Sequence, residues 1–260
     1  MPPRARREGL IGWAGALLIA IWGWAAKASI LLKLVLGGAK ATTFLSMLAS
    51  FGLYALWGGP GFAAGLILMI FVHEMGHVIE IRRQGMQASA PIFIPFMGAA
   101  IFQRSHPTNA LRQAEIGIAG PIAGTIAATV AFVLHAETHW EMLLLWAWIG
   151  FWINLINLIP AGFLDGGWIL GAVSKWFQVA GLAAVVLGVF VFDFISPLML
   201  IFVLLGLPVV FDRFRNDRSP YYQSVPVSAR WAMGGLWLLL VLYLGFATLE
   251  TTNLLAPIVR

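Results

Sequence analysis

Residues 61–83 place four ionisable side chains inside an apolar run that is long enough to enter a lipid bilayer. His73, Glu74, His77 and Glu80 lie within about two helical turns of one another. Titratable side chains are costly at membrane depth, so a group of them indicates a functional site. This segment therefore predicts a membrane helix whose polar residues share a task.

The order His73-Glu74-Met75-Gly76-His77 indicates what that task is. Positions i and i+4 of a helix lie one above the other, so both imidazoles can reach one metal ion. Glu74 lies about 100° round the helix from His73, where it can contact a water on the metal and act as a general base. The alternative is a chance spacing in a packed core. That alternative would leave three desolvated ionisable groups unmatched, so we favour the metal site.

The chain as a whole is too apolar for a soluble domain. It has 260 residues, of which 60% are hydrophobic and 10% charged, and a mean hydropathy of +0.88. We therefore expect an all-α polytopic membrane protein. The net charge of +5 comes from Arg and Lys between apolar runs, which indicates membrane topology and not a nucleic-acid partner. Because there is no Cys, any metal must be held by His and carboxylates.

The apolar runs predict about six transmembrane helices, an amino-terminal interfacial or re-entrant segment, and a membrane re-entrant loop after the HExxH helix. The amino-terminal basic segment, residues 1–40, contains an apolar run with interspersed Lys and Trp that suits an interfacial helix. Residues 41–171 form the expected catalytic membrane core, and residues 172–260 the carboxy-terminal transmembrane helices. The turn Gly58-Gly59-Pro60-Gly61 is expected to separate two helices. Later helices are expected over residues 111–136, 140–159, 168–192, 195–211 and 231–249.

Charge placement predicts the orientation of these helices. If Arg82, Arg83 and Arg112 are cytoplasmic, residues 137–141 lie outside and the Arg-containing segment 213–230 returns inside. This arrangement satisfies the positive-inside rule. We therefore expect an integral protein of the cell membrane whose active site opens toward the cytoplasmic side.

A catalytic zinc site usually takes three protein ligands and keeps one position for water, so two His require a third ligand. Asp165 is the best candidate because it lies in a helix break, residues 160–167, where irregular backbone at membrane depth must be buried or line a cavity. The alternative is a turn aspartate at the membrane surface. Asn154 and Asn157 suit interhelical hydrogen bonds, and Asn157 is also expected to orient a ligand. The other candidates lie in a loop, at the far membrane face or too far along the same helix: His106, His135, His139, Asp193 and Glu80.

At this point a family resemblance is specific. The motif HEMGH in an apolar helix, followed by NLIPAGFLDG over residues 157–166, resembles the site-2 protease family of intramembrane zinc metalloproteases, in a short form without peptide-binding or nucleotide-sensing domains. That family pairs H-E-x-x-H with N-x-x-P-x-x-x-L-D-G. Gly120-Pro121 and the stretch IFIPFMGAA, residues 92–100, occupy the places of its glycine-rich element and its re-entrant loop. Gly124 stands where many relatives have Asn, and the likeness covers roughly residues 61–171.

The resemblance implies that His73, His77 and Asp165 bind one zinc ion per chain and that Glu74 is the catalytic base. It also implies hydrolysis of peptide bonds in or near transmembrane segments of other membrane proteins, as in regulated intramembrane proteolysis. The expected partners are a transmembrane protein substrate, the lipid bilayer and a regulatory membrane protein. An unwound substrate segment could add to the re-entrant stretch as a strand. The residues expected to bind it are Ile92, Phe93, Ile94, Pro95 and Phe96.

Three alternatives stay open. One is a non-catalytic metal-binding membrane scaffold of the same fold, against which the presence of Glu74 argues. Another is a membrane-embedded zinc protease for soluble segments, although such enzymes usually take a third ligand from a Glu on a second helix. A metal transporter is the weakest, because the polar residues form one cluster and no path across the membrane. Two imidazoles and a carboxylate would also hold divalent ions other than zinc.

Overall fold

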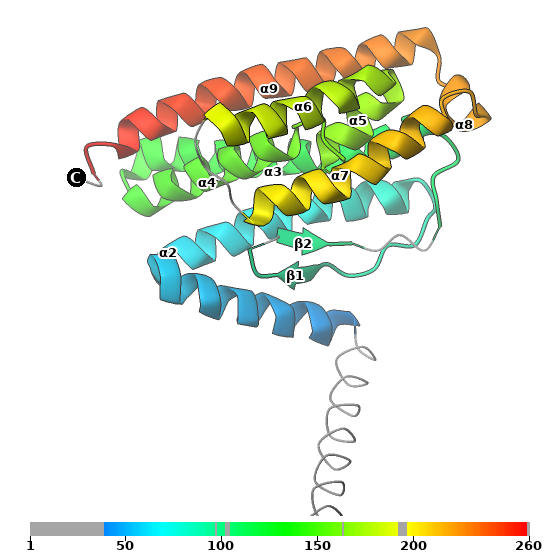
Figure 1. The fold of residues 1–260 in the computed structure, drawn as a ribbon. Helices are drawn as coiled ribbons and strands as arrows, with labels where there is room; N and C mark the ends of the chain where they lie inside the picture. Colours follow the sequence, from blue (N-terminus) through cyan, green and yellow to red (C-terminus); the bar gives the residue numbers. More distant parts are fainter. Residues whose placement is uncertain (1–38, 97, 102–104, 163, 192–196, 259–260) are drawn as a thin grey trace, which may run out of the picture.

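The computed structural model describes residues 39–96, 98–101, 105–162, 164–191 and 197–258. These residues form a helical protein with one small β-hairpin, which confirms the expected all-α class (Figure 1). The predicted interfacial run within residues 1–40 lies almost wholly outside the described residues. The elements are α2 (Ala39–Arg83), β1 (Ile92–Ile94), β2 (Gly98–Ala100), α3 (Ala110–Thr138), α4 (Glu141–Asn157), α5 (Asp165–Val173), α6 (Lys175–Val191), α7 (Pro197–Arg215), α8 (Pro220–Gln223) and α9 (Val227–Leu255).

Helix α2 consists of two limbs that meet at Gly59. The φ and ψ angles of Gly59 are 83° and 163°, outside the helical region and in a conformation that glycine adopts most easily. Pro60 follows and suits a helix start, because the first N–H groups of a helix have no intrahelical partner. We call residues 39–58 the first limb and residues 60–83 the second limb. Figure 1 shows the two limbs folding back at an acute angle, at the predicted turn.

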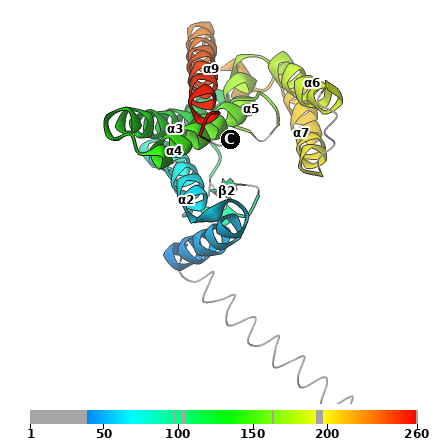
Figure 2. The same cartoon turned by 90° about the vertical axis from the view of Figure 1, so that its left-hand side faces the viewer.

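The second limb packs against α3 and α4, and α9 covers the other side of α3, α4 and α5 (Figures 1 and 2). Glycines bring the backbones together. A Cβ on Gly76 of the second limb would collide with the carbonyl oxygen of Ala119 on α3, and one on Gly150 of α4 would come within 2.7 Å of Ala128 Cβ. Small residues at such crossings let membrane helices approach closely. Gly76 thus places the HExxH segment directly against the backbone of α3.

The expected single helix over residues 168–192 is wrong, because two helices occupy that range. Helix α5 ends at Val173, Ser174 is extended, and α6 begins at Lys175. The end of α5 is fixed from outside: Arg230 of α9 donates to the carbonyl oxygens of Ala172 and Val173 at 3.0 and 2.9 Å. These are among the carbonyls that a helix end leaves without a partner. The guanidinium thus stabilises a break that the apolar sequence does not reveal.

Among the described residues, three helices are long and apolar enough to cross a membrane. They are Ala41–Arg83, Ala110–Thr138 and Val227–Leu255, while Glu141–Asn157 and Lys175–Leu187 are shorter apolar helices. The protein is thus an integral membrane protein, and the count of about six spans stays a prediction. Figure 2 shows α6 and α7 together on one flank, with α3 and α4 on the other.

The arginines of the described residues gather at one end of the helices. Figure 1 shows α2 ending, α3 beginning and α8 lying at the same end, opposite the carboxyl terminus. Gln84 donates to the carbonyl oxygen of Arg112 at 3.0 Å, which ties the end of α2 to the start of α3. Near α8, Asp217 pairs with Lys175 at 2.8 Å and with Arg213 at 2.7 Å. Hydrogen bonds from these two cations hold the pKa of Asp217 below its usual value.

Candidate metal centre

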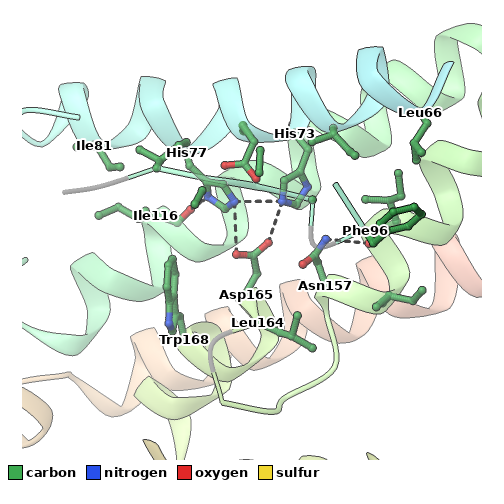
Figure 3. Close-up of a pocket in the computed structure, with 18 of the residues that line it drawn as sticks. Leu66, His73, His77, Ile81, Phe96, Ile116, Asn157, Leu164, Asp165 and Trp168 are labelled. Atoms are coloured by element: carbon green, nitrogen blue, oxygen red, sulfur yellow. Dashed lines mark hydrogen bonds and ion pairs between the residues drawn. The ribbon is translucent and has the colours of Figure 1, made fainter. Parts of the chain in front are cut away.

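Three buried side chains converge beside the second limb. His73 Nε2 lies 3.2 Å from His77 Nε2 and 3.1 Å from Asp165 Oδ2, and His77 Nε2 lies 3.4 Å from Asp165 Oδ1 (Figure 3). The three side chains offer ligand atoms that all lie within 4.8 Å of one another. The i, i+4 spacing accounts for the two imidazoles, and the helix break accounts for the carboxylate. The structure therefore brings together the three residues that the sequence selected, in a group that could hold a metal ion.

Hydrogen bonds on the far side of each imidazole indicate which nitrogen carries a proton. His77 Nδ1 lies 2.7 Å from the carbonyl oxygen of Ile116, which can only accept, so this nitrogen donates. His73 Nδ1 lies 2.9 Å from Asn154 Oδ1 and donates in the same way. Both Nε2 atoms of the neutral rings then present lone pairs toward Asp165. Two imidazole nitrogens and a carboxylate at these distances form the donor set of a His and carboxylate metal site.

The local backbone sets the position of Asp165. Leu158 is the last residue before the break, Gly162 adopts a positive φ of 54°, and α5 begins at Asp165 itself. A Cβ on Gly166 would collide with the carbonyl oxygen of Leu158, so only glycine fits after the aspartate. Asp165 is 6% exposed, and its Oδ2 has no hydrogen-bond donor among the described residues. A buried carboxylate oxygen without a donor fits a metal ligand.

Glu74 shares a cavity with the three converging residues. The cavity has a volume of about 500 Å³, and its wall is mostly apolar. Glu74 is half-buried and lies on the second limb between the two imidazoles in sequence. Asn157 and Leu164 also reach this wall. A carboxylate beside three potential metal ligands in a mostly apolar cavity has the surroundings that general bases use.

The two asparagines of α4 differ in what they touch. Asn154 accepts from His73, whereas Asn157 lines the cavity and donates to the carbonyl oxygen of Ile153 on its own helix at 3.0 Å. The sequence interpretation gave Asn154 only an interhelical hydrogen bond and named Asn157 as the residue that orients a ligand. The direct contact to a histidine comes from Asn154. The sequence shows two amides one helical turn apart, either of which could contact a histidine, but it does not show which one faces α2.

The β-hairpin forms another wall of the cavity. Strands β1 and β2 are antiparallel, with Ile92 opposite Ala100, Phe93 opposite Ala99 and Ile94 opposite Gly98. The first limb holds the outer edge of β1 through three hydroxyls. Thr43 donates to the Pro91 carbonyl at 2.6 Å, Ser46 accepts from Phe93 N at 3.1 Å, and Tyr54 accepts from Phe96 N at 2.8 Å.

This contact decides which strand edge faces the cavity. Because the N–H of Phe93 donates to Ser46, the pair Phe93 and Ala99 is a non-hydrogen-bonded pair of the ladder. The N–H and carbonyl of Ala99 therefore point away from β1. Gly98, Ala99 and Ala100 all line the cavity. Of the five residues expected to bind substrate, Phe96 lines this cavity and Phe93 is buried against the first limb. The sequence did not separate the two strands.

Known proteins support the assignment of this region. Residues 61–139 match the model of peptidase family M50. This part of the chain is thus similar to peptidase family M50. The segment holds both histidines of the HExxH motif and the Gly120-Pro121 element, and it ends before α4 and Asp165.

Curated proteins that are similar to this chain carry the name of a zinc metalloprotease. The chain is 28% identical over 163 residues to "Probable zinc metalloprotease EGY2, chloroplastic" of Arabidopsis thaliana, covering 46% of this chain and 29% of that protein. The protein of the same name from Oryza sativa subsp. indica is 28% identical over 152 residues, covering 42% and 28%. The chain thus spans less than a third of the curated relatives it matches. A solved structure, "Site-2 Protease from Methanocaldococcus jannaschii", matches with 20% identity and a TM-score of 0.40, covering 68% of this chain and 88% of that one.

Proposed function

We propose that this protein is an intramembrane zinc metalloprotease that hydrolyses peptide bonds in or near transmembrane segments of other membrane proteins. The convergence of His73, His77 and Asp165 beside Glu74, in a cavity inside an apolar helix bundle, carries the proposal. The curated relatives named zinc metalloproteases support the choice of metal. Residues 41–171 are the proposed catalytic core. The proposed metal ligands are His73, His77 and Asp165, with one zinc ion per chain.

The chemistry that we propose follows from this donor set. Zinc bound there would supply a water whose pKa is about 7, low enough for nucleophilic attack at neutral pH. Glu74 takes the proton of the attacking water and later delivers it to the leaving amine. The Ile116 carbonyl holds the imidazole of His77 and Asn154 holds that of His73, while the mostly apolar wall of the cavity limits the access of bulk water. A low-dielectric enclosure strengthens the electrostatic part of such catalysis.

The proposed substrate is a transmembrane segment that has unwound. A helix hides its peptide groups in its own hydrogen bonds, so an unwound segment needs new backbone partners. The outer edge of β2 can supply them, because Ala99 directs its N–H and carbonyl away from β1 beside the catalytic cavity. The residues 92–96 of the hairpin then act by holding β2 in place, with Phe96 touching the bound chain. Strand addition of this kind gives affinity through the main chain.

The charge distribution supports a location in the cell membrane with the site open toward the cytoplasm. The end of α2, the start of α3 and α8 lie together, and these regions contain Arg82, Arg83, Arg112 and Arg218. The positive-inside rule makes this end cytoplasmic. His77 precedes Arg83 by six residues, or about 9 Å along a helix. The proposed partners are the substrate, the lipid bilayer and a regulatory membrane protein.

Zinc content and cleavage by the purified full chain in liposomes test the proposal. The probe is a single-span reporter whose transmembrane segment contains Gly and Asn to ease unwinding. We expect one zinc per native chain and cleavage within that segment. Glu74→Gln is the matched variant, because it preserves shape and the metal ligands. It should keep its zinc and cleave at least about 10²-fold more slowly, since general acid–base catalysis contributes about 10²–10⁴-fold.

Asp165→Ala distinguishes the contribution of the metal to cleavage from that of Glu74. It should lose zinc and cleavage together while the helices stay folded by circular dichroism. Equal cleavage by native and Glu74→Gln protein would contradict the role of Glu74. A folded native chain that binds zinc but cleaves no reporter in a panel of varied transmembrane segments would leave the non-catalytic scaffold as the better description.

A further inference from the structure

Asn154 is a buried amide whose two ends are both occupied. Its side chain is 0% exposed. Its Nδ2 donates to the carbonyl oxygen of Gly150, one turn earlier on α4, at 2.7 Å. Its Oδ1 accepts from His73 Nδ1 at 2.9 Å. A polar group this deep in an apolar bundle is costly unless both ends are satisfied, so this residue is built into the site.

The Gly150 carbonyl settles which way the amide faces. A carbonyl oxygen can only accept, so the NH₂ end of Asn154 must lie against it. The oxygen end is then left for His73, and only a protonated Nδ1 can donate to it. The tautomer of His73 follows: its proton is on Nδ1, and the Nε2 lone pair points at Asp165. Second partners of this kind orient metal-binding imidazoles and raise their basicity.

Gly124 on α3 gives the amide its space. A Cβ built on Gly124 would collide with both terminal atoms of the Asn154 amide and lie 2.7 Å from its Cγ. Gly124 is buried, and α3 packs directly on α4 at this level. A methyl group there must push the amide off His73 or push α3 from α4. The absence of a side chain on one helix thus allows the hydrogen bond between the other two.

We propose that Asn154 is a positioning residue that fixes the tautomer and ring orientation of His73 for metal binding, and that Gly124 is its obligatory partner on α3. Three helices then contribute to the position of His73: α3 supplies the space, α4 the amide and α2 the ligand itself. Asn157, the first residue of the NLIP sequence, donates to the Ile153 carbonyl and has no such contact to a histidine among the described residues. The proposal rests on the metal site of the proposed function, but it does not depend on peptide cleavage.

The test measures zinc affinity of the purified full chain by competition with a chelator. Asn154→Ala should weaken zinc binding by about 10–100-fold, the usual cost of losing such a partner. Asn154→Asp keeps an acceptor for His73 Nδ1, so it should bind zinc more tightly than Asn154→Ala. The visible spectrum of the Co²⁺-substituted protein should change in Asn154→Ala, because the His73 ring is no longer held. Asn157→Ala is the matched control and should keep the native zinc affinity.

Gly124→Ala tests the pairing. It should weaken zinc binding in the native chain but have little further effect in the Asn154→Ala background, since coupled residues give non-additive effects. If Gly124 were important only for helix packing, Gly124→Ala would lower the zinc affinity by the same factor in both backgrounds. Gly245→Ala on α9, where nothing lies within 4 Å of the added Cβ, controls for the substitution itself. Should Asn154→Ala fail to fold, Asn154→Ser, which shortens the side chain and removes the amide, replaces it as the second background for Gly124→Ala.

The outcomes distinguish this proposal from the proposed function. Native zinc affinity in Asn154→Ala, or equal effects of Gly124→Ala in the two backgrounds, overturns the pairing and leaves the protease assignment standing. A folded native chain that binds no zinc overturns the proposed function itself. Loss of affinity in Asn154→Ala, partial recovery in Asn154→Asp and non-additivity with Gly124→Ala together support the positioning role.

Discussion

The two limbs of α2 are both apolar helices, yet they are held in opposite ways. The second limb is fixed by close packing: His73 and Val78 are 4% and 2% exposed, and Gly76 lies against the backbone of α3. The first limb exposes large apolar side chains, with Leu56 and Trp57 at 88% and 75% exposed, and contacts the hairpin through hydroxyls.

The difference indicates that the two limbs of α2 have different roles. Close packing leaves few alternative positions, which suits metal ligands that must keep their geometry. Single hydroxyl-to-backbone hydrogen bonds are each worth only about 0.5–1.5 kcal/mol, so they can be exchanged without unfolding the core. We therefore expect the first limb and the hairpin to adjust to a bound chain while the second limb stays fixed.

Metal removal should show the largest contrast between the limbs. A ligand present at about 1,000 times its dissociation constant stabilises the folded protein by about 4.1 kcal/mol, and the chelated chain loses this. The loss of stability should be largest in the second limb and α5, where the three converging residues lie. Hydrogen exchange with and without a zinc chelator measures it. Equal loss of protection in the first limb would show that the two limbs respond as one unit.

A pair of glycine substitutions sharpens the same contrast at intermediate size. Gly76→Ala should destabilise the protein by about 1–3 kcal/mol, because its Cβ would collide with the backbone of α3 in a packed core. Gly52→Ala on the first limb meets nothing within 4 Å and should stabilise by about 0.4–1 kcal/mol through lower chain entropy. Unfolding free energies from SDS titration in mixed micelles check both. The comparison fails if the two changes have the same sign.

The hydroxyl contacts of the first limb should give the smallest effect. Ser46→Ala removes the acceptor of Phe93 N and should cost about 0.5–1.5 kcal/mol at the hairpin. Ser50→Ala is the matched control one turn away, since the buried Ser50 hydroxyl has no hydrogen-bond partner in the described part of the chain. Amide exchange at Phe93 should speed up in Ser46→Ala alone. No change in either variant would mean that packing, not the hydroxyls, holds the hairpin.

Helix periodicity was enough to predict the HExxH part of the site. His73 and His77 both lie on the second limb, which is helical throughout, so their shared face follows from the spacing alone. Asp165 lies on a different helix, and its selection needed the helix break and the family resemblance. The sequence also predicts the turn at Gly59, since Gly-Gly-Pro-Gly has few structural alternatives.

Tertiary contacts account for what the sequence did not reveal. The end of α5 at Val173 depends on Arg230, which lies far away in the sequence. The choice between Asn154 and Asn157 depends on how α4 is rotated, and that depends on the space at Gly124. Which edge of the hairpin faces the cavity depends on the hydroxyls of Ser46 and Tyr54, which lie on the first limb, far before β1 in the sequence. Local patterns cannot carry such information, because each feature is a property of a pair of distant residues.

The separation of the site residues along the chain has a consequence for biosynthesis. His73 and Asn154 are 81 positions apart, and Asp165 comes later still. A nascent chain therefore carries the HExxH helix through the membrane insertion machinery well before its carboxylate has been translated. During that interval an incomplete chain has both imidazoles and Glu74 but lacks Asp165. Synthesis order thus leaves this group of side chains incomplete until α2, α3 and α4 have all been translated.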